Sequence, residues 1–325
     1  MNADTARPLV TLDEIRAAAA RIRGVARRTP LVHGSSSPRA TTLLLKCENM
    51  QVAGAFKIRG AANMLARLDR DDLARGVITY SSGNHGQALA CAAQLLGAPA
   101  VVVMPTTAPS VKVNGARSFG AEVVFAGTTS SERKAEAERI RLARGLVMVP
   151  PFDHPWIIAG QGTVGLEILE DCPDLVEVYV PVGGGGLLAG VAAAVKGLRP
   201  DARVIGVEPA GAAKMSRSLA AGAPVTLAST SSIADGLLPV RPGDLTFAHA
   251  QRLVHEVVTV NDDSLADAVR YLAREAKILV EPSGAASVAA VRQRYRSLDA
   301  IDRPIVAVLS GGNIALEQMA AILMG

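Results

Sequence analysis

The feature of this sequence that most restricts its fold is the alternation of short valine- and isoleucine-rich runs with alanine-rich segments of helix length. The runs read, in chain order, VITYSS, AVVVMP, AEVVFA, LVMVP, EVYVPV, RVIGVEP and PIVAVLSGG. Segments such as SERKAEAERIRLAR and LLAGVAAAVKGL separate them and predict helices. Strands that are apolar almost throughout and alternate with helices are typical of parallel sheets covered on both faces. The sequence therefore predicts an α/β fold.

The first block of this alternation, residues 76–152, has the size of a compact small domain. We expect residues 1–75 and 153–325 to form a larger domain, with the N-terminal segment folded back onto the C-terminal part. A chain of 325 residues, 49% of them hydrophobic, is long and apolar enough for two such cores. The prediction is a two-domain open parallel-sheet fold.

Charge and cysteine usage exclude several kinds of partner. The net charge of +4 comes from 34 basic and 30 acidic residues that are scattered, without a basic run interleaved with aromatic residues, so we expect no nucleic-acid binding. Glycine and proline interrupt the longest uncharged stretch, so we expect no membrane span. Cys47, Cys91 and Cys172 show neither CxxC nor zinc-ligand spacing. This spacing indicates that the three cysteines are free thiols in a reducing compartment, so we predict a cytoplasmic protein.

Three junctions between a predicted strand and the following segment are rich in glycine and small polar residues. They are SSGNHGQ at 81–87, PVGGGGLLAG at 181–190 and LSGGN at 309–313. Ligands of parallel α/β sheets bind at such junctions. Four consecutive glycines are costly to order, but at the start of a helix their backbone N–H groups can surround an anion. The second loop is therefore predicted to hold a phosphate.

A dinucleotide site is an alternative explanation of the same loop. Gly184, Gly186 and Ala189 fit GxGxxA after a strand, and Glu208 ends the next strand, where a ribose-binding acid would lie. On this loop alone a nicotinamide-dependent dehydrogenase (NAD as cofactor) is tenable. A phosphate-only ligand explains the glycines equally well.

The lysines distinguish the two interpretations. Of seven lysines, Lys57 in GAFKIRG combines apolar neighbours with flanking glycines that let a ligand approach, whereas the other six are expected in solvated helical, loop or ordinary strand positions. Desolvation lowers the pKa of a lysine and produces the neutral amine that attacks aldehydes. A phosphate loop together with such a lysine indicates pyridoxal phosphate bonded to Lys57. The alternative is a lysine that snorkels at a domain boundary.

Six motifs occur in a fixed order along the chain: GAFKIRGA, SSGNHGQALA, PVGGGGLLAG, IADG, EPSGAA and LSGGN. Together they closely resemble the pyridoxal-phosphate serine/threonine dehydratase and serine racemase family, of the tryptophan synthase β-like fold. The resemblance runs from about Leu12 to the C-terminus. It implies a two-domain enzyme, a homodimer, with the cofactor in the cleft between the domains.

The resemblance also assigns roles position by position. Lys57 would be the Schiff-base lysine, Phe56 would lie beside the cofactor, and Asn84 would hydrogen-bond its 3-hydroxyl. Ser310 would face the pyridine nitrogen, and a hydroxyl there favours elimination over chemistry that needs a long-lived carbanion. The phosphate would be held by Gly183, Gly184, Gly185, Gly186 and Leu187. The substrate α-carboxylate would lie against Ser81, Ser82, Asn84 and His85.

The implied reaction converts a small 3-hydroxy amino acid, L-threonine or L-serine first, into a 2-oxo acid and ammonia, with Lys57 removing the α-proton. Ser82 stands where racemase members use a serine on the opposite face, so an amino-acid racemase is an alternative. A non-catalytic cofactor-binding protein is a further alternative, which the occupied catalytic positions disfavour.

The chain departs from the family pattern at several positions. Metal-binding members carry an aspartate six residues after Glu208, where this chain has Lys214, so we expect a salt bridge and no metal. Ala53 stands in place of a hydroxyl residue near the lysine. Arg133 aligns with an arginine that some members turn toward the substrate; an inward Arg133 would suit 3-hydroxyaspartate, although a surface helix is the simpler interpretation. Pro239 stands where family members would contact the substrate side chain. Another candidate substrate is 3-phenylserine.

Overall fold

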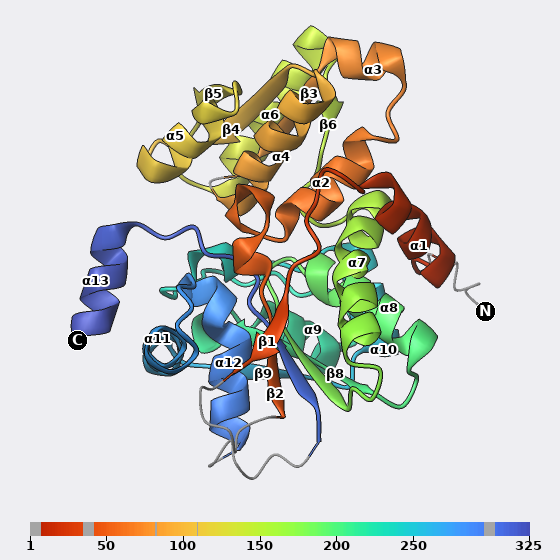
Figure 1. Cartoon of the computed structure of the whole chain (residues 1–325). Coiled ribbons are helices and arrows are strands. Elements are labelled where there is room, and N and C mark those ends of the chain that lie inside the picture. The colour runs from red at the N-terminus through yellow and green to blue at the C-terminus, as the bar shows by residue number, and fades with distance from the viewer. Residues whose placement is uncertain (1–7, 35–41, 82, 109, 296–302) are drawn as a thin grey trace.

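The computed structural model describes residues 8–34, 42–81, 83–108, 110–295 and 303–325. This part of the chain contains two separate sheets, each flanked by helices (Figure 1). The larger sheet has six strands in the order β1-β2-β10-β7-β8-β9, and the smaller has four in the order β5-β4-β3-β6. The predicted α/β class with parallel sheets is confirmed.

The larger sheet is parallel except at one edge, where β1 and β2 pair antiparallel. Its strands are β1 Leu31–His33, β2 Leu43–Lys46, β7 Glu177–Pro181, β8 Arg203–Pro209, β9 Glu256–Val260 and β10 Ile305–Val308. The sequence pattern does not predict β1 or β9. Strand β1 has only three residues and β9 is a half-exposed edge strand, so neither forms a continuous apolar run.

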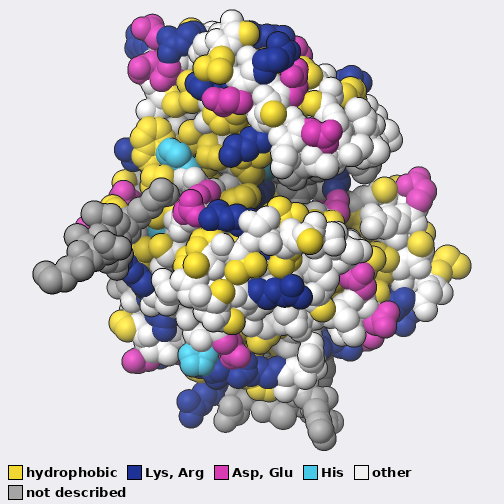
Figure 2. All heavy atoms as spheres, turned by 180° about the vertical axis from the view of Figure 1, so that it is seen from behind, with side chains coloured by type: hydrophobic (Ala, Val, Ile, Leu, Met, Phe, Trp, Pro, Cys, Tyr) yellow, Lys and Arg dark blue, Asp and Glu magenta, His cyan; other side chains and the backbone are white. Residues whose placement is uncertain are grey.

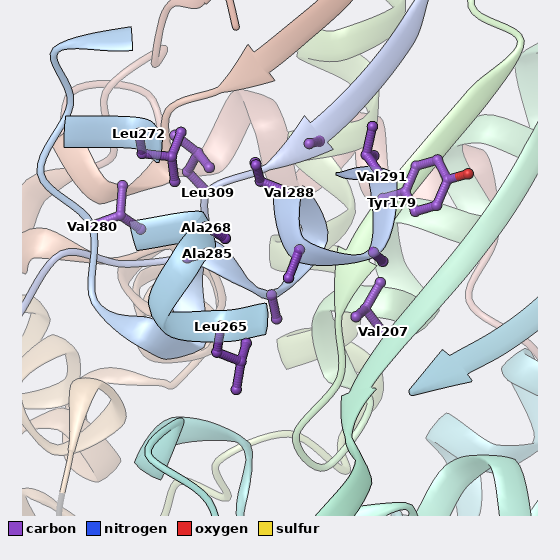
Figure 3. Close-up of a cluster of buried hydrophobic side chains, with 14 of the residues drawn as sticks. Tyr179, Val207, Leu265, Ala268, Leu272, Val280, Ala285, Val288, Val291 and Leu309 are labelled. Atoms are coloured by element: carbon purple, nitrogen blue, oxygen red, sulfur yellow. The ribbon is translucent and has the colours of Figure 1, made fainter. Parts of the chain in front are cut away.

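Helices cover both faces of the larger sheet because side chains of successive strand residues point to opposite sides. Val178 and Val180 of β7 pack with α7 and α8, whereas Tyr179 packs with α11 and α12. In Figure 3, side chains of α12 lie between Tyr179 and Val207 of the sheet and the α11 side. The helices of this part are α1 Leu12–Arg21, α7 Pro155–Asp171, α8 Gly186–Leu198, α9 Lys214–Ala221, α10 Asp244–Leu253, α11 Asp262–Tyr271, α12 Pro282–Arg294 and α13 Leu316–Met324.

The smaller sheet is parallel throughout. Its strands are β3 Val77–Tyr80, β4 Ala100–Met104, β5 Glu122–Phe125 and β6 Val147–Met148. The helices around it are α3 Arg70–Arg75, α4 Asn84–Leu96, α5 Ser110–Ser118 and α6 Ser130–Arg144. Val102 of β4 packs with α4 and α5, while Val101 and Val103 pack with α6 on the opposite face.

Helix α2, Lys57–Leu65, lies between the two sets of elements (Figure 1). Its apolar side chains share a buried cluster with those of α4. On its other side it approaches α7 so closely that a Cβ on Gly160 would lie 2.6 Å from the Arg59 carbonyl oxygen. The buried Arg59 side chain forms ion pairs with Glu48, at 2.7 Å, and with Glu167 of α7, at 2.6 Å. The boundary of a small domain at residues 76–152 stays a prediction.

Basic and acidic side chains are interspersed on the face of the molecule shown in Figure 2. Within the described residues, every helix is too short or too polar to cross a bilayer.

Candidate active site

The segment before Lys57 is paired with the loop that follows β10. Phe56 N–H donates to the Ser310 carbonyl oxygen at 3.1 Å, and Gly312 N–H donates to the Gly54 carbonyl oxygen at 2.9 Å. Gly54 has a φ of +71°, and a Cβ there would come within 2.1 Å of Asn313 Oδ1. Glycine at this position is therefore required both by the backbone conformation and by the close packing of the two loops.

Lys57 is the first residue of α2 and is partly buried. Its Nζ donates a 2.7 Å hydrogen bond to the Pro151 carbonyl oxygen and lies 5.1 Å from the centre of the Phe56 ring. Burial lowers the pKa of the Lys57 ammonium to about 8. Among the described residues, no carboxylate forms an ion pair with this lysine. The charged form therefore lacks the partner that would otherwise keep its pKa high.

The expectation of a solvated position is wrong for Lys112, and Lys46 and Lys214 do not occupy the ordinary strand and loop positions expected of them. Lys46, Lys112 and Lys214 are buried, and each is paired with a carboxylate. Lys46 lies in the interior strand β2, with its Nζ 2.6 Å from Glu167. What distinguishes Lys57 is thus the absence of a compensating acid rather than burial alone, and local sequence does not reveal such long-range pairing.

The four-glycine loop connects β7 to α8. Gly185 has a φ of +98°, which favours glycine. The backbone N–H groups of residues 183–187 make no hydrogen bond to other described residues, so they are available to an external acceptor. Several N–H groups at the start of a 13-residue helix suit a phosphate.

Lys57 and the glycine loop are joined through Pro151 and Phe152. Pro151 accepts the hydrogen bond from Lys57 Nζ, and the ring of Phe152 lies against Gly184, where a Cβ would come within 2.2 Å of Cδ1. Phe56 packs on the cluster that contains Leu187. The N–H-lined loop and the uncompensated amine therefore lie near each other and fit a ligand with a phosphate and an aldehyde. Sequence reasoning missed Pro151 and Phe152, whose motif PPF carries no chemical signal.

Asn84 begins α4 at the end of the loop after β3. Its Nδ2 donates to Glu281 Oε1 at 2.6 Å, and its Oδ1 accepts from Asn313 Nδ2 at 3.0 Å. Burial, and then the neighbouring Asp235, raise the pKa of the Glu281 carboxyl to about 7. Glu281 is not among the residues predicted from the sequence, although its charge within the motif EPSGAA is a signal that could have revealed it.

His85 is 2% exposed, and burial lowers its pKa to about 3, so the ring is neutral. Its Nε2 lies 3.1 Å from the Val149 carbonyl oxygen, which can only accept, so Nε2 carries the hydrogen and Nδ1 a lone pair. Nδ1 has no hydrogen-bond partner among the described residues. The ring therefore cannot donate from Nδ1 to a carboxylate, and only the backbone N–H of His85 suits that contact.

The remaining predicted positions are distributed as follows. Ser81 Oγ accepts from Gly83 N–H at 3.3 Å, whereas Ser82 lies outside the described residues. Ser310 Oγ makes a long contact of 3.5 Å to the Ser283 carbonyl oxygen, which leaves the hydroxyl free to turn to another partner. Arg133 is on α6 and donates to the Thr128 carbonyl oxygen at 3.2 Å.

Two further departures from the family pattern have structural counterparts. Ala53 has a φ of +58°, which an alanine adopts at a cost. Its carbonyl oxygen accepts from Asn313 Nδ2 at 2.8 Å, and this contact helps to hold the conformation. The Cδ of Pro239 would lie 3.7 Å from a Cβ on Gly183, so Pro239 borders the glycine loop.

The interpretation of the glycine loop as a dinucleotide site is wrong, because the Glu208 carboxylate is not available to a ribose. The Glu208 side chain is fully buried, and both of its oxygens are already bonded. Oε1 accepts from Met215 N–H at 2.7 Å, and Oε2 accepts from Ser216 N–H at 2.9 Å. A carboxylate that caps α9 from the interior cannot reach ribose hydroxyls.

The same carboxylate is 3.1 Å from Lys214 Nζ, so the predicted salt bridge is confirmed. An ammonium in this position does not fit a metal site, because it repels a cation and takes up the oxygen ligands. The described residues hold no group of three or more His, Cys, Asp or Glu side chains suited to a metal ion.

Comparison with known proteins agrees with this geometry. The chain is 42% identical over 317 residues to the L-threonine ammonia-lyase of Thermotoga maritima, and the aligned region covers 97% of this chain and 78% of that protein. It is 37% identical over 322 residues to the L-threo-3-hydroxyaspartate ammonia-lyase of a Pseudomonas species, covering 98% of this chain and 99% of that one. The structure of maize serine racemase superposes with a TM-score of 0.91 at 39% identity and covers 98% of both chains.

Residues 22–311 match the family model described as "Pyridoxal-phosphate dependent enzyme". The glycine loop, the uncompensated Lys57 and the tryptophan synthase β-like arrangement of the two sheets agree with that match. The chain therefore belongs to the pyridoxal-phosphate dependent enzymes of fold type II, and pyridoxal phosphate is its cofactor.

Proposed function

We propose that this chain is an ammonia-lyase that converts a small 3-hydroxy amino acid, L-threonine or L-serine first, to a 2-oxo acid and ammonia. The observation that carries the proposal is Lys57, an amine that pairs with no carboxylate of the described residues and lies beside a loop whose N–H groups bond to none of them. With its pKa near 8, roughly a tenth of the lysine side chains are neutral at pH 7. That fraction supplies both a nucleophile and a base.

Each residue has a place in binding the cofactor. The backbone N–H groups of residues 183–187 would bind the phosphate, and Phe56 would lie beside the ring. Asn84 is held by Glu281 and Asn313, and its remaining N–H and lone pair would bind the ring 3-hydroxyl. The bound cofactor supplies the electron sink for the chemistry at the substrate Cα.

The substrate carboxylate binds at the start of α4, where the backbone N–H groups of Asn84 and His85 make no hydrogen bond to other described residues. The positive end of that helix favours an anion. Lys57 then accepts the proton from the substrate Cα, and the Pro151 carbonyl oxygen orients its Nζ. Ser310 offers a hydroxyl rather than a carboxylate to the ring nitrogen, which supports elimination, because the departing 3-hydroxyl takes the charge away.

A lyase for 3-hydroxyaspartate is a second candidate, and Lys112 is the observation that favours it. This buried lysine of α5 forms an ion pair with Asp235. Its Nζ would lie 3.9 Å from a Cβ on Gly83, in the loop that precedes Asn84. An anionic substrate side chain could compete with Asp235 for this cation. Lys112 therefore suits that role better than Arg133, which donates to the Thr128 carbonyl oxygen.

The test is 2-oxo acid release from both enantiomers of serine and threonine, 3-hydroxyaspartate and 3-phenylserine, with chiral analysis of the unreacted substrate. We expect release from L-threonine or L-serine that is lost in Lys57→Ala and kept in Lys196→Ala, a matched lysine of α8 near the surface. Inversion of the substrate without 2-oxo acid would identify a racemase instead. A preference for 3-hydroxyaspartate that falls in Lys112→Met would select the second candidate.

A further inference from the structure

The ammonium of Lys214 lies in a cage of oxygen atoms directly behind the glycine loop. Its Nζ donates to the carbonyl oxygens of Val182 at 2.8 Å, Leu237 at 3.0 Å and Ala212 at 3.1 Å. Glu208 Oε1 is the fourth oxygen, at 3.1 Å, and both charged side chains are fully buried. Four oxygens around one buried positive charge form a coordination shell rather than a simple ion pair.

The cage joins segments that are far apart in the sequence. Val182 directly precedes Gly183, the first glycine of the loop, and Leu237 ends the short helical turn Asp235–Leu237. Gly236 of the same turn also contacts the loop, since a Cβ on Gly183 would lie 2.9 Å from the Gly236 carbonyl oxygen. The Lys214 ammonium therefore links the residue before the loop to this turn.

The chemistry of the cage is that of a monovalent cation site. Its ligands are three neutral carbonyls and one carboxylate, which together carry a single negative charge, so one positive charge neutralises them. Carbonyl oxygens can replace the hydration shell of K⁺, and NH₄⁺ presents the same N–H donors as a lysine. A Mg²⁺ ion requires near-octahedral oxygen coordination at shorter distances and would leave the cage with a net positive charge.

We propose that Lys214 is a positioning residue whose ammonium serves as a built-in cation beneath the phosphate-binding loop, and that trimming its side chain opens a site for free K⁺ or NH₄⁺. The proposal requires that pyridoxal phosphate binds this chain and is independent of the amino acid that the enzyme converts.

The test compares Lys214→Ala, which empties the cage, with Lys214→Met, which fills it with an uncharged chain of similar length. Lys196→Ala is the control, because Lys196 also donates to two carbonyl oxygens, at 2.8 and 2.7 Å, but lies at a partly exposed helix end. The two measurements are the dissociation constant of pyridoxal phosphate and the unfolding midpoint of the cofactor-free protein. Each is recorded while choline chloride is replaced stepwise by KCl or NH₄Cl at constant ionic strength.

For Lys214→Ala in choline chloride we expect cofactor binding to weaken by about tenfold or more, as for the loss of a charged buried contact. K⁺ or NH₄⁺ should restore both binding and the unfolding midpoint in a saturable way. Lys214→Met should be weakened without rescue, and the wild type and Lys196→Ala should not respond. The proposal is overturned if Lys214→Ala shows no specific cation response, including the case in which it stays unfolded in all salts. It is also overturned if Lys214→Met binds the cofactor like wild type, or if a chelator removes cofactor from the wild type.

Discussion

Asn84 Nδ2 donates a 2.6 Å hydrogen bond to Glu281 Oε1, which ties the first residue of α4, beside the smaller sheet, to the residue that precedes α12, beside the larger one. The acceptor is an acid whose pKa is raised to about 7 by burial. The contact therefore carries a pH dependence of its own.

Glu281→Gln should remove that pH dependence. Between pH 4.5 and 7 the unfolded chain releases the Glu281 proton while the folded chain keeps it. The contribution of Glu281 to the free energy of unfolding of the wild type therefore decreases progressively as pH rises through this window. This difference between the pKa values of Glu281 in the unfolded and folded states corresponds to about 3 kcal/mol of unfolding free energy. Glutamine can still accept from Asn84. The free energy of unfolding of the cofactor-free variant relative to wild type should therefore rise by that amount over the window, measured by urea denaturation at several pH values.

The matched control for this experiment is Glu136→Gln, because Glu136 is a partly exposed acid whose pKa is lowered by its hydrogen bond to Arg139. Its variant should show no rise over the same window, since its contribution has the opposite sign. Parallel curves for wild type and Glu281→Gln would contradict the raised pKa.

The pKa of Lys57 predicts how the cofactor-free protein takes up pyridoxal phosphate. The neutral amine attacks the aldehyde, and its fraction rises with pH, reaches one half near pH 8 and levels off above that value. The initial rate of chromophore formation should thus show a midpoint near 8, with no chromophore in Lys57→Ala and an unchanged profile in Lys196→Ala. A rate that continues to climb beyond pH 10, as for an ordinary lysine, would disprove this.

Gly185 and Gly222 form a matched pair for the phosphate loop. Both have positive φ, +98° and +70°, but a Cβ on Gly222 meets nothing within 4 Å, whereas one on Gly185 would lie 2.8 Å from Met215 Cε and 2.9 Å from Thr246 Cβ. Gly222→Ala should cost about 1 kcal/mol of backbone strain. Gly185→Ala should cost about 1–3 kcal/mol more from overpacking and should weaken cofactor binding as well.

Denaturant titrations and cofactor titrations of the two alanine variants measure these effects separately. Equal stability losses with equal cofactor affinity would show that the shape of the loop is not set by Gly185.

Arg59→Met should be strongly destabilising. The substitution leaves Glu48, which is fully buried, without its main cationic partner. It also removes the ion pair between Arg59 and Glu167. Loss of one member of such a network costs about 3–5 kcal/mol. Arg139→Met, which breaks an exposed pair with Glu136 on α6, should change the urea midpoint little. Comparable midpoints for the two variants would mean that the buried network contributes nothing beyond a surface pair.

Local patterns predict the interior strands and the glycine loops of this chain, but not the contacts between them. The apolar runs that become β7 and β8 are visible because both faces of the sheet are covered, while the edge strand β9 is half-exposed and leaves no such run. Lys57 and the loop at Gly185 are recognisable because their requirements are local. The absence of a carboxylate partner for Lys57 among the described residues is not recognisable from the sequence, since it depends on where carboxylates lie in the folded chain.

The same limit applies to the partners of the predicted residues. Lys46 is separated from Glu167 by 121 residues in the sequence, and Asn84 is separated from Glu281 by 197. Nothing in the segment LLLKCEN indicates that its lysine is buried, because the compensating charge comes from a distant helix. Burial of a charge is a property of the pair, and the pairing appears only once the chain has folded.

The position of α2 has a consequence for any relative movement of the two sheets. Ion pairs of Arg59 and a 2.6 Å hydrogen bond from Asn63 to the Trp156 carbonyl oxygen attach α2 to α7 and the larger sheet. Among the described residues, its contact with α4 is apolar and has no ion pair. We therefore expect any closing rotation to occur as slippage between α2 and α4. Lys57, the first residue of α2, would then keep its place beside the larger sheet.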